Sequence, residues 1–567
     1  MPRDSTSKWD GYGTLTNQLN GLPMLAYRGA TGKAKKLVKR VILLTLILLS
    51  SVIGTGCVST EESPAQNSIV YGLTLEPSGF DPHIHQSSEL GIVLRQVYDT
   101  LVYRHPETRE VVPGLADSWT ISDDGRVYTF NLRQDVTFHD GTAFNAQAVG
   151  ANLDRIVSPD ISSQRAAFML GPYQSYEIVD TFTIRIVLSE PYAPLLDSLS
   201  QVYLGMASPA AFNEYSPGRY QFHQVGTGPF TFESFVPGDR IVLRRNPAYN
   251  WGPEFYQMPE SNPVDEIIYR FYTDPATRAL ALESGEAQIM GEIAPSDASV
   301  LSTGGTVDLL PTTIPGMPMQ FMFNTQRAPT DNLAVRQALL YATNRGLIVD
   351  TVFRGFSRVG WGPVTSETLY YTREVEGRYA FDIAQAATLL ETAGYRDTNG
   401  DGLLDDGTSP LEIVLIVPPW GFIPEIAQLI QSQWRELGIT AVLRQVAGFG
   451  ALREAAAEGD YHLIAFDTAG YDPSILNQFY LSDGANNFTN YTNSELDAAL
   501  LQAMREQAPN TRRTLYTRIQ QFIMDQALIL PIREYVNLNA ALPGIDGLRY
   551  DQYGWFPLIH DVSYERD

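Results

Sequence analysis

The sequence from Val97 to Ile156 reads VYDTLVYRHPETREVVPGLADSWTISDDGRVYTFNLRQDVTFHDGTAFNAQAVGANLDRI. Two stretches of alternating polar and apolar residues flank the turn sequence SDDG at 122–125, which predicts a β-hairpin. The residues expected on the buried face of its second strand are Tyr128, Phe130 and Leu132. After a further turn, Asn145 can cap a helix whose apolar residues recur at three- and four-residue spacing. The stretch therefore predicts the order strand, turn, strand, turn, helix.

The sequence after residue 410 gives a clear α/β signal. It predicts strands at 411–417, 439–443 and 461–466, separated by helices at 424–437 and 451–458. Strands that alternate with helices in this way form a locally parallel sheet. In such sheets ligands bind outside the carboxyl ends of the strands. The residues that follow Val417 and Phe466 are therefore candidates for ligand binding, among them Trp420 and Asp467.

Other elements are predicted between these two regions. Alternation predicts a half-buried strand at 181–188 and a hairpin at 230–245 that turns at Pro237-Gly238. A helix is expected from Pro275, capped by Asp274, to Gly285. The apolar run 317–323 predicts a buried strand, followed by a helix capped near Asp331.

The first 66 residues have the composition of an export segment. A cluster of Lys and Arg at 33–40 precedes the apolar run 41–54, which is shorter than the roughly 20 residues that a transmembrane helix needs. Cys57, the only cysteine of the chain, follows this run. Its context resembles the lipobox of bacterial lipoproteins, in which the cysteine receives a diacylglycerol and becomes the mature N-terminus. We expect a signal peptide at 1–56, a lipid tether on Cys57 and a polar linker at 57–66.

Charge restricts the possible partners and chemistry. The chain carries 40 basic and 64 acidic residues, a net charge of −24. Residues 1–56 hold eight of the basic and two of the acidic residues, so without them the net charge would be −30. Nucleic acids and anionic lipid surfaces are poor partners for such a chain. All lysines lie within the first 40 residues, which leaves none for a Schiff base or a phosphate-binding loop after export.

The stretch VVPGLADSWTISDDGRVYTFNLRQDVTFHDGTAFNAQAV at 111–149 resembles the signature block of family 5 extracellular solute-binding proteins. These are the dipeptide, oligopeptide and nickel receptors of ABC importers. Further segments resemble the same family in the same order, namely LEPSGFDPH at 75–83, GTGPFTFESFVPGDRIVLRRNP at 226–247, FNTQRAPTDNLAVRQALLYATNR at 323–345 and residues 487–500. The resemblance extends from about residue 67 to the C-terminus.

The resemblance implies a bilobal α/β fold of the periplasmic-binding-protein type II, with an extra inserted domain and a ligand cleft between the lobes. Lobe I would comprise 67–102, 226–320 and 535–567, domain II 103–225, and lobe III 321–534. It also implies a lipid-anchored, extracytoplasmic and monomeric receptor, without enzymatic activity, that delivers a small solute to ABC permease subunits. The most direct expectation for the ligand is a di- or oligopeptide, and an oligosaccharide is the alternative within the family.

The resemblance identifies the segment 467–491 as facing the ligand. In peptide receptors of the family an aspartate just before the tyrosine of this segment commonly pairs with the α-amine, whereas Gly470 occupies that position here. Either Asp467 or Asp472 replaces it, or the ligand is not an α-amino peptide, because a buried ammonium needs a carboxylate partner. The candidate ligand-binding residues are Trp420, Asp467, Tyr471, Asp472, Asn486, Asn487 and Tyr491. Arg354 and Arg358 are weaker candidates for a carboxylate partner.

The sequence offers two candidate metal sites and one enzymatic alternative. Asp397, Asn399, Asp401 and Asp405 have the spacing that opens a calcium loop, but Thr408 stands at the twelfth position in place of a bidentate glutamate. A weak structural calcium site or a polar turn is expected there, and no other cofactor. His83 and His85 lack a third ligand for nickel. A secreted glycosidase acting through two carboxylates is the alternative from another class of protein.

Overall fold

In the computed structural model, the described residues are 67–77 and 79–565. They belong to one compact unit, Ala65–Asp567. The expected signal peptide at 1–56 and the linker at 57–66, including Cys57, lie outside the described residues. In the part that is described, no helix combines the length and apolar character that crossing a membrane requires.

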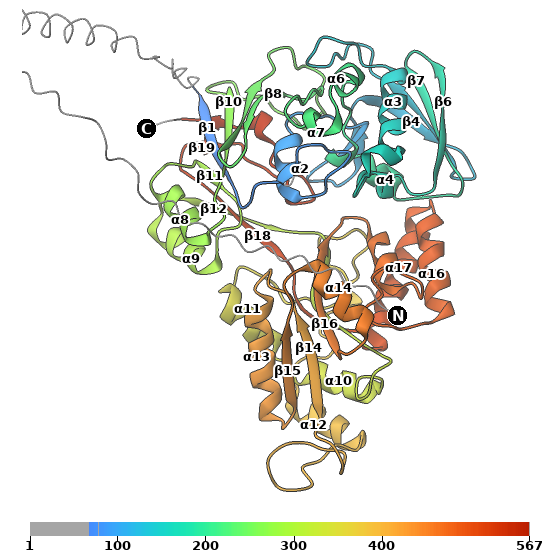
Figure 1. Cartoon of the computed structure of the whole chain (residues 1–567), viewed down its shortest axis with the longest axis vertical. Helices are drawn as coiled ribbons and strands as arrows, with labels where there is room; N and C mark the ends of the chain where they lie inside the picture. The colour runs from blue at the N-terminus through green and yellow to red at the C-terminus, as the bar shows by residue number, and fades with distance from the viewer. Residues whose placement is uncertain (1–66, 78, 566–567) are drawn as a thin grey trace, which may run out of the picture. The chain divides into compact units, whose positions relative to one another are not determined.

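One mixed sheet of seven strands contains the first described strand (Figure 1). β1 pairs in parallel with β10 and β11, and the other neighbouring strands pair antiparallel. The predicted hairpin at 230–245 is confirmed as β8 and β9. In spatial order the strands are β12 (Asp308–Thr313), β18 (Val536–Ala541), β11 (Ile289–Met290), β1 (Ser68–Leu73), β10 (Glu266–Phe271), β9 (Arg240–Arg245) and β8 (Phe230–Val236).

Helices and short pairs of strands surround this sheet. The predicted helix that begins at Pro275 is confirmed as α8, and the Asp274 carboxylate caps it by accepting hydrogen bonds from the N–H groups of Ala276 and Thr277. The helices are α2 (Ser88–Leu94), α8 (Pro275–Glu283) and α9 (Pro295–Gly304), and the paired strands are β2 (Val102–Arg104) with β3 (Val111–Pro113) and β19 (Ile545–Asp546) with β20 (Ser563–Tyr564).

The segment 97–156 contributes two strands to a four-stranded antiparallel sheet. Its hairpin is confirmed, and Tyr128, Phe130 and Leu132 are buried on one face. This face continues the apolar core of the seven-stranded sheet. The strands are β4 (Ala116–Ile121), β5 (Val127–Leu132), β7 (Thr183–Leu188) and β6 (Tyr173–Asp180) in spatial order, with α3 (Ala146–Val157), α4 (Ala166–Met169), α5 (Leu195–Ser198), α6 (Pro209–Glu214) and α7 (Pro217–Tyr220) nearby in the chain.

The cap of α3 is the one that the sequence predicts. The side-chain oxygen of Asn145 accepts a hydrogen bond of 3.0 Å from the N–H of Ala148. We expect Asn145→Ala to lower the free energy of unfolding by about 1 kcal/mol, because an N–H group of the first turn loses its partner. Urea unfolding would measure the loss. Gln147→Ala, an exposed substitution in the same turn, is the matched control, and an equal loss in both variants would contradict the capping role.

A five-stranded sheet forms the second large core. β14 pairs in parallel with β15 and β16, as the sequence predicts, while β13 pairs antiparallel with β16 and β17. The strand predicted at 317–323 is β13, which is buried along its whole length. In spatial order the strands are β15 (Thr440–Gln445), β14 (Glu412–Val417), β16 (Leu463–Ala469), β13 (Gly316–Phe323) and β17 (Ile529–Arg533).

Helices cover both faces of this sheet (Figure 1). One face packs against α10 (Leu333–Tyr341), α11 (Arg345–Phe353), α12 (Ile383–Thr392) and α13 (Ile423–Glu436). The other face packs against α14 (Phe449–Glu458), α15 (Asn477–Tyr480), α16 (Ser494–Arg505) and α17 (Pro509–Asp525). The cap of α10 is Asn332, one residue beyond the Asp331 expected from the sequence.

The chain passes between the two large sheets at two points. β12 and β13 belong to different sheets, and so do β17 and β18. We call residues 67–313 and 536–565 the large lobe and residues 316–533 the small lobe. β13 begins at Gly316, before the boundary expected near residue 320. The finer division into lobe I, domain II and lobe III stays a prediction.

The two lobes touch at several buried groups. Tyr471, which follows β16 of the small lobe, is 2 % exposed and is part of the apolar core of the large lobe. Its ring packs under the guanidinium of Arg104, 4.7 Å from ring centre to guanidinium carbon, and against the ring of Tyr553. The backbone N–H of Ala193 donates a hydrogen bond of 2.9 Å to the carbonyl of Met504. The lobes are therefore held together by direct contacts.

Candidate functional site

A pocket of about 200 Å³ lies between the lobes, close to the two chain crossings. The small lobe contributes the end of α11, the turn after β14 and the end of β17. The large lobe contributes the start of α8, the segment before α9 and the start of β18. The lining residues are Pro275, Arg278, Glu292, Ile293, Ala294, Pro295, Phe353, Phe356, Ser357, Gly421, Phe422, Arg533, Tyr535, Val536, Asn537 and Leu538.

The turn after β14 brings Trp420 to the end of β16. Gly421 and Phe422 both have positive φ, of 62° and 63°, so the chain reverses sharply before α13 begins. Such a backbone is costly for Phe422 and is characteristic of functional loops. The indole N–H of Trp420 donates a hydrogen bond of 3.3 Å to Asp467. These two residues lie together at the carboxyl ends of neighbouring parallel strands, where the sequence led us to expect ligand.

Asp467 is a half-buried carboxylate without a salt bridge to any described residue. Burial raises its pKa above the ordinary aspartate value, although the charge of Arg533 and the N–H of Trp420 act in the opposite direction. One of its oxygens lies 4.0 Å from the point where a Cβ on Gly421 would stand. The carboxylate is therefore placed beside the pocket wall and has capacity for a further partner.

Arg533, Tyr535 and Glu292 form a connected polar group in the pocket, which is also lined by Arg278, Ser357 and Asn537. The Arg533 guanidinium lies between the rings of Phe353 and Tyr535, at 4.1 and 4.5 Å from their centres. The hydroxyl of Tyr535 donates a hydrogen bond of 2.8 Å to Glu292, which has a φ of 50°. The ring of Tyr535 also packs against Trp555 at 5.7 Å. These residues were not among the candidates expected from the sequence, although Arg533, a charged residue at the end of the buried strand β17, was an available signal.

Tyr471 and Asp472 are occupied by contacts within the protein. The ring of Tyr471 packs against Arg104 and Tyr553 of the large lobe. Asp472 is 6 % exposed, and its two oxygens accept hydrogen bonds of 2.6 and 2.8 Å from Arg512. A Cβ at Gly470 would lie 2.9 Å from the end of the Ile475 side chain, so this position leaves little room for an aspartate.

Asn486, Asn487 and Tyr491 do not line the pocket. The backbone N–H of Thr325 donates a hydrogen bond of 2.9 Å to the carbonyl of Thr489. Thr325 follows β13, and the end of β13 pairs with the start of β16. The loop that contains Thr489 therefore lies near the start of β16. The amide of Asn487 donates to the carbonyls of Leu481 and Tyr491, both at 3.0 Å. These bonds stabilise the loop itself. The side chain of Asn487 therefore has a structural role in this loop.

The remaining candidate side chains have structural contacts or face solvent. His83 is buried, accepts a hydrogen bond from Arg155 and lies 3.0 Å from the Gly205 carbonyl. Burial, with the nearby charge of Arg155, lowers its pKa to about 4. The pKa of His85 is lowered by burial as well. Arg354 and Arg358 are exposed and do not line the pocket.

The loop with calcium-like spacing is closed by its own backbone. The carboxylate of Asp397 accepts hydrogen bonds from Gly400 and Gly402, at 2.7 and 3.0 Å. The side chain of Asn399 accepts a hydrogen bond from the N–H of Asp401, and that of Asp401 from the N–H of Leu403. The carboxylate of Asp405 accepts hydrogen bonds from the N–H groups of Thr398 and Gly407. No group of three or more His, Cys, Asp or Glu side chains in the described ranges is arranged to hold a metal ion. A calcium site here stays a prediction.

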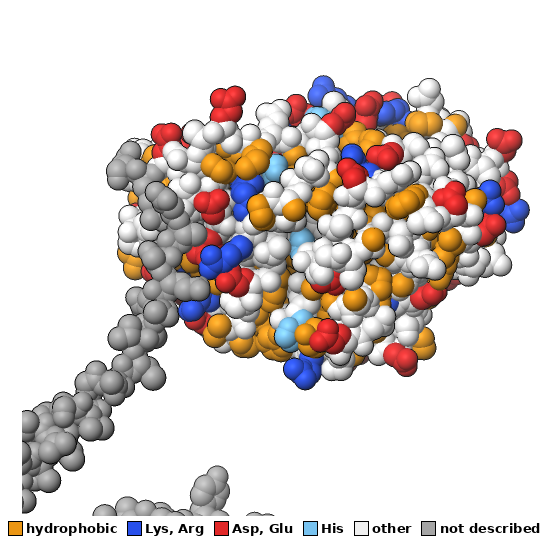
Figure 2. All heavy atoms as spheres, turned by 90° about the horizontal axis from the view of Figure 1, so that it is seen from above, with side chains coloured by type: hydrophobic (Ala, Val, Ile, Leu, Met, Phe, Trp, Pro, Cys, Tyr) orange, Lys and Arg blue, Asp and Glu red, His pale blue; other side chains and the backbone are white. Residues whose placement is uncertain are grey.

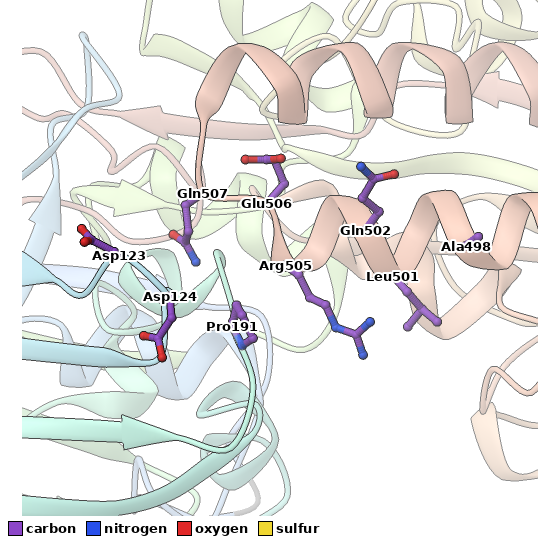
Figure 3. A pocket seen from close by; sticks show the side chains of 9 residues that line it. All are labelled: Asp123, Asp124, Pro191, Ala498, Leu501, Gln502, Arg505, Glu506 and Gln507. Carbon is purple, nitrogen blue, oxygen red and sulfur yellow. The ribbon is translucent and has the colours of Figure 1, made fainter.

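A larger groove, of about 640 Å³, lies between the turn that joins β4 and β5 and the end of α16 (Figure 3). Arg505 at this end forms an ion pair with Glu190, at 2.6 Å. Most residues that line the groove are exposed. On the face of the molecule shown in Figure 2, acidic, basic and apolar side chains are interspersed. The smaller, more buried pocket is therefore the candidate ligand site.

Known proteins are similar to this chain over most of its length. Residues 110–490 match the family model of the bacterial extracellular solute-binding proteins, family 5. The glutathione-binding protein GsiB of Salmonella typhi is 29 % identical over 441 residues, which cover 74 % of this chain and 79 % of GsiB. The heme-binding protein A of Haemophilus influenzae is 28 % identical over 523 residues, covering 87 % and 92 % of the two chains.

Solved structures give the same result for the fold. NikA from Brucella suis in complex with Fe(III)-EDTA superposes with a TM-score of 0.78 at 25 % identity, covering 88 % of this chain and all of NikA. The expected periplasmic-binding-protein fold is thereby confirmed. Proteins of this family are the non-enzymatic, extracytoplasmic binding components of ABC transporters, which rules out the glycosidase alternative. The chain belongs to the bacterial extracellular solute-binding proteins of family 5.

Proposed function

We propose that this protein captures a small peptide between its two lobes and delivers it to the permease of an ABC importer. The observation that carries the proposal is the pocket lined by both lobes at the ends of β14 and β17, with the salt-bridge-free carboxylate of Asp467 at its side. Glutathione, for which the relative GsiB is named, is itself a tripeptide. A ligand that touches both lobes favours their closed arrangement only through tighter binding to that arrangement.

Within this proposal, Asp467 receives the ammonium group of the peptide. Of the two aspartates that could replace the missing anchor at Gly470, Asp472 is already paired with Arg512 on both oxygens. Among the described residues, Asp467 accepts a side-chain hydrogen bond only from Trp420, and that bond is long at 3.3 Å. A hydrogen bond from an ammonium to a half-buried carboxylate contributes about 1.5–3 kcal/mol.

We expect Asp467→Asn to weaken the binding of peptides with a free amine by about 10- to 100-fold, because the ammonium loses its charged partner. The experiment uses residues 58–567, which contain the whole compact unit, and an equimolar mixture of tripeptides with free or acetylated amines. Native mass spectrometry and calorimetry measure the affinities. A free-amine preference that persists in Asp467→Asn would contradict the anchor. Retention of a sugar in place of any peptide would favour the oligosaccharide alternative.

The pH dependence provides a second readout of the same residue. The raised pKa of Asp467 means that its carboxylate becomes protonated at a higher pH than an exposed aspartate. Peptide affinity of the wild-type protein should therefore fall as the pH is lowered through this pKa, while the charge of the peptide amine does not change there. The Asp467→Asn variant should show a flatter profile over the same range. Identical profiles for the two proteins would exclude Asp467 as the titrating group.

The proposal includes the setting expected from the sequence. Cys57 would carry a diacylglycerol that tethers a monomeric receptor to the outer face of the cell membrane, because two acyl chains bind stably where one does not. The polar residues 57–66 would then separate the lipid from the lobes. The high negative charge of the chain is compatible with a tether that does not rely on anionic lipid headgroups.

A further inference from the structure

Among the described residues, two exposed ion pairs join the large lobe to the small lobe. Arg109, in the turn between β2 and β3, pairs with Glu367 of the small lobe. Glu190, which follows β7, accepts hydrogen bonds of 2.9 and 2.6 Å from the guanidinium of Arg505 at the end of α16 (Figure 3). The large lobe supplies the cation of the first pair and the anion of the second. The two pairs therefore have opposite polarity, and the lobes are complementary at both points only in this alignment.

Both large-lobe partners belong to the range 103–225 that is expected as an inserted domain. None of the described residues that line the pocket between the lobes comes from this range. Next to the second ion pair, the backbone N–H of Ala193 donates to the carbonyl of Met504 at 2.9 Å. The contacts of this range with the small lobe therefore act on the arrangement of the lobes and not on the contents of the pocket.

Glu367 lies between two residues that bind the chain crossings. The hydroxyl of Thr368 accepts a hydrogen bond of 2.8 Å from the N–H of Gly316, the first residue of β13. The carboxylate of Glu534, directly after β17, accepts hydrogen bonds of 2.7 and 2.8 Å from the N–H and the hydroxyl of Ser366. The loop that carries this ion pair is therefore fixed to the chain at both crossings.

The same ion pair adjoins the buried contact at Tyr471. The N–H of Leu369 donates a hydrogen bond of 3.0 Å to the carbonyl of Tyr471. On the large lobe, the carbonyl of Arg109 accepts a hydrogen bond of 2.9 Å from Arg104, whose guanidinium lies over the Tyr471 ring. The exposed ion pair and the buried contact are therefore made or lost together when the lobes move.

We infer that the range 103–225 acts as an electrostatic clasp, in which the pairs Arg109–Glu367 and Glu190–Arg505 favour the closed arrangement of the ligand-free protein. One exposed ion pair contributes little, but two pairs that are far apart and form in the same movement add their effects. Salt screens exposed charges, so the clasp should weaken as the ionic strength rises. The inference goes beyond the proposed function, because it holds for a ligand of any chemistry.

The distance between the lobes tests this inference without a ligand. Residues 58–567 contain no cysteine, so Ser175→Cys in β6 and Ser494→Cys at the start of α16 place two spin labels at exposed positions of opposite lobes. Double electron–electron resonance then measures the shares of closed and open protein from the distances between the labels. We expect high salt to raise the ratio of open to closed protein about 3- to 10-fold.

Charge reversal assigns the effect to each pair. Glu367→Arg places two cations opposite each other and should raise the ratio of open to closed protein about 3- to 10-fold. Adding Arg109→Glu to this variant should restore the wild-type distances. Glu190→Arg, with and without Arg505→Glu, repeats the test at the second pair. Glu391→Arg is the matched control, because it makes the same change of charge at an exposed ion pair within the small lobe.

The outcomes separate this inference from the proposed function. Distances that neither salt nor charge reversal changes, in variants that unfold at the wild-type temperature, would overturn the clasp. Exchanged pairs that leave the lobes open would overturn it as well, because lost packing and not charge would then account for the opening. If a single reversal does not fold, the salt dependence of the wild type decides alone. Absence of peptide binding in a protein whose lobes respond as expected would overturn the proposed function and leave the clasp.

Discussion

Replacing Asp472 by asparagine is expected to lower the free energy of unfolding by about 3–5 kcal/mol. The substitution leaves the guanidinium of Arg512 buried without its counter-charge. Arg512 is 4 % exposed, donates to both oxygens of Asp472 and to the carbonyl of Ala503, and lies near the rings of Tyr370 and Tyr516. The surrounding structure therefore cannot release it to water without unpacking α17. Thermal and urea unfolding of residues 58–567 would measure the loss.

The difference in stability between the wild type and Asp472→Asn should depend on pH. Burial alone would raise the pKa of Asp472, but Arg512 and the N–H of Ser474 lower it below the ordinary value. A carboxylate whose pKa is depressed on folding stabilises the protein above its unfolded pKa of about 3.9, and this stabilisation is lost as the pH falls through the folded pKa. Wild type and Asp472→Asn should therefore become more similar in stability in acid.

Two further variants test the cause. Asp124→Asn removes an exposed ion pair with Arg126 and should change stability little. The double replacement Asp472→Leu with Arg512→Met removes both charges and should recover most of the stability, because a buried pair can often be exchanged for apolar side chains. A double variant as unstable as Asp472→Asn would show that lost packing, and not the unpaired charge, accounts for the effect.

The regular elements were predictable because local signals decide them. Alternation over 127–132 places Tyr128 and Phe130 on one face in any sheet, and Asn145 caps α3 without help from the rest of the chain. The order β14, α13, β15, α14, β16 follows from apolar runs of the right lengths. The antiparallel pairs of this sheet, β16 with β13 and β13 with β17, were not predicted, because β13 and β17 come from segments far away in the sequence.

The sequence predicted only those residues of the candidate site whose position follows from the end of a single strand. Trp420 and Asp467 lie at the carboxyl ends of β14 and β16, which are parallel neighbours. The rule that ligands bind outside the carboxyl ends of such strands therefore predicts both residues. Glu292, Arg533 and Tyr535 meet because β18 pairs with β11 and β12 across the second chain crossing, and no local pattern encodes that register. Asn487 and Tyr491 follow Asp467 in sequence, but the chain has by then returned to the start of β16.

The contact between the lobes at Tyr471 leads to the second large prediction. The guanidinium of Arg104 and the ring of Tyr553, both from the large lobe, pack on Tyr471 of the small lobe. A cation–π contact and an aromatic pair together contribute about 1–3 kcal/mol, and both are lost when the lobes separate. Tyr471→Ala should therefore destabilise the closed arrangement by this amount. Small-angle scattering should report a larger radius of gyration for the ligand-free variant.

The same change should weaken ligand binding although Tyr471 does not line the pocket. If the ligand binds the closed arrangement, every 1.4 kcal/mol lost from closure raises the apparent Kd about tenfold, so we expect a 10- to 100-fold loss for Tyr471→Ala. Tyr471→Phe keeps the ring and both contacts, and is the matched control with near wild-type affinity. Tyr553→Ala removes the partner ring from the large lobe and should be less than additive with Tyr471→Ala. Unchanged affinity and radius in folded Tyr471→Ala would mean that closure, and with it the capture of ligand, depends on contacts nearer to Arg533.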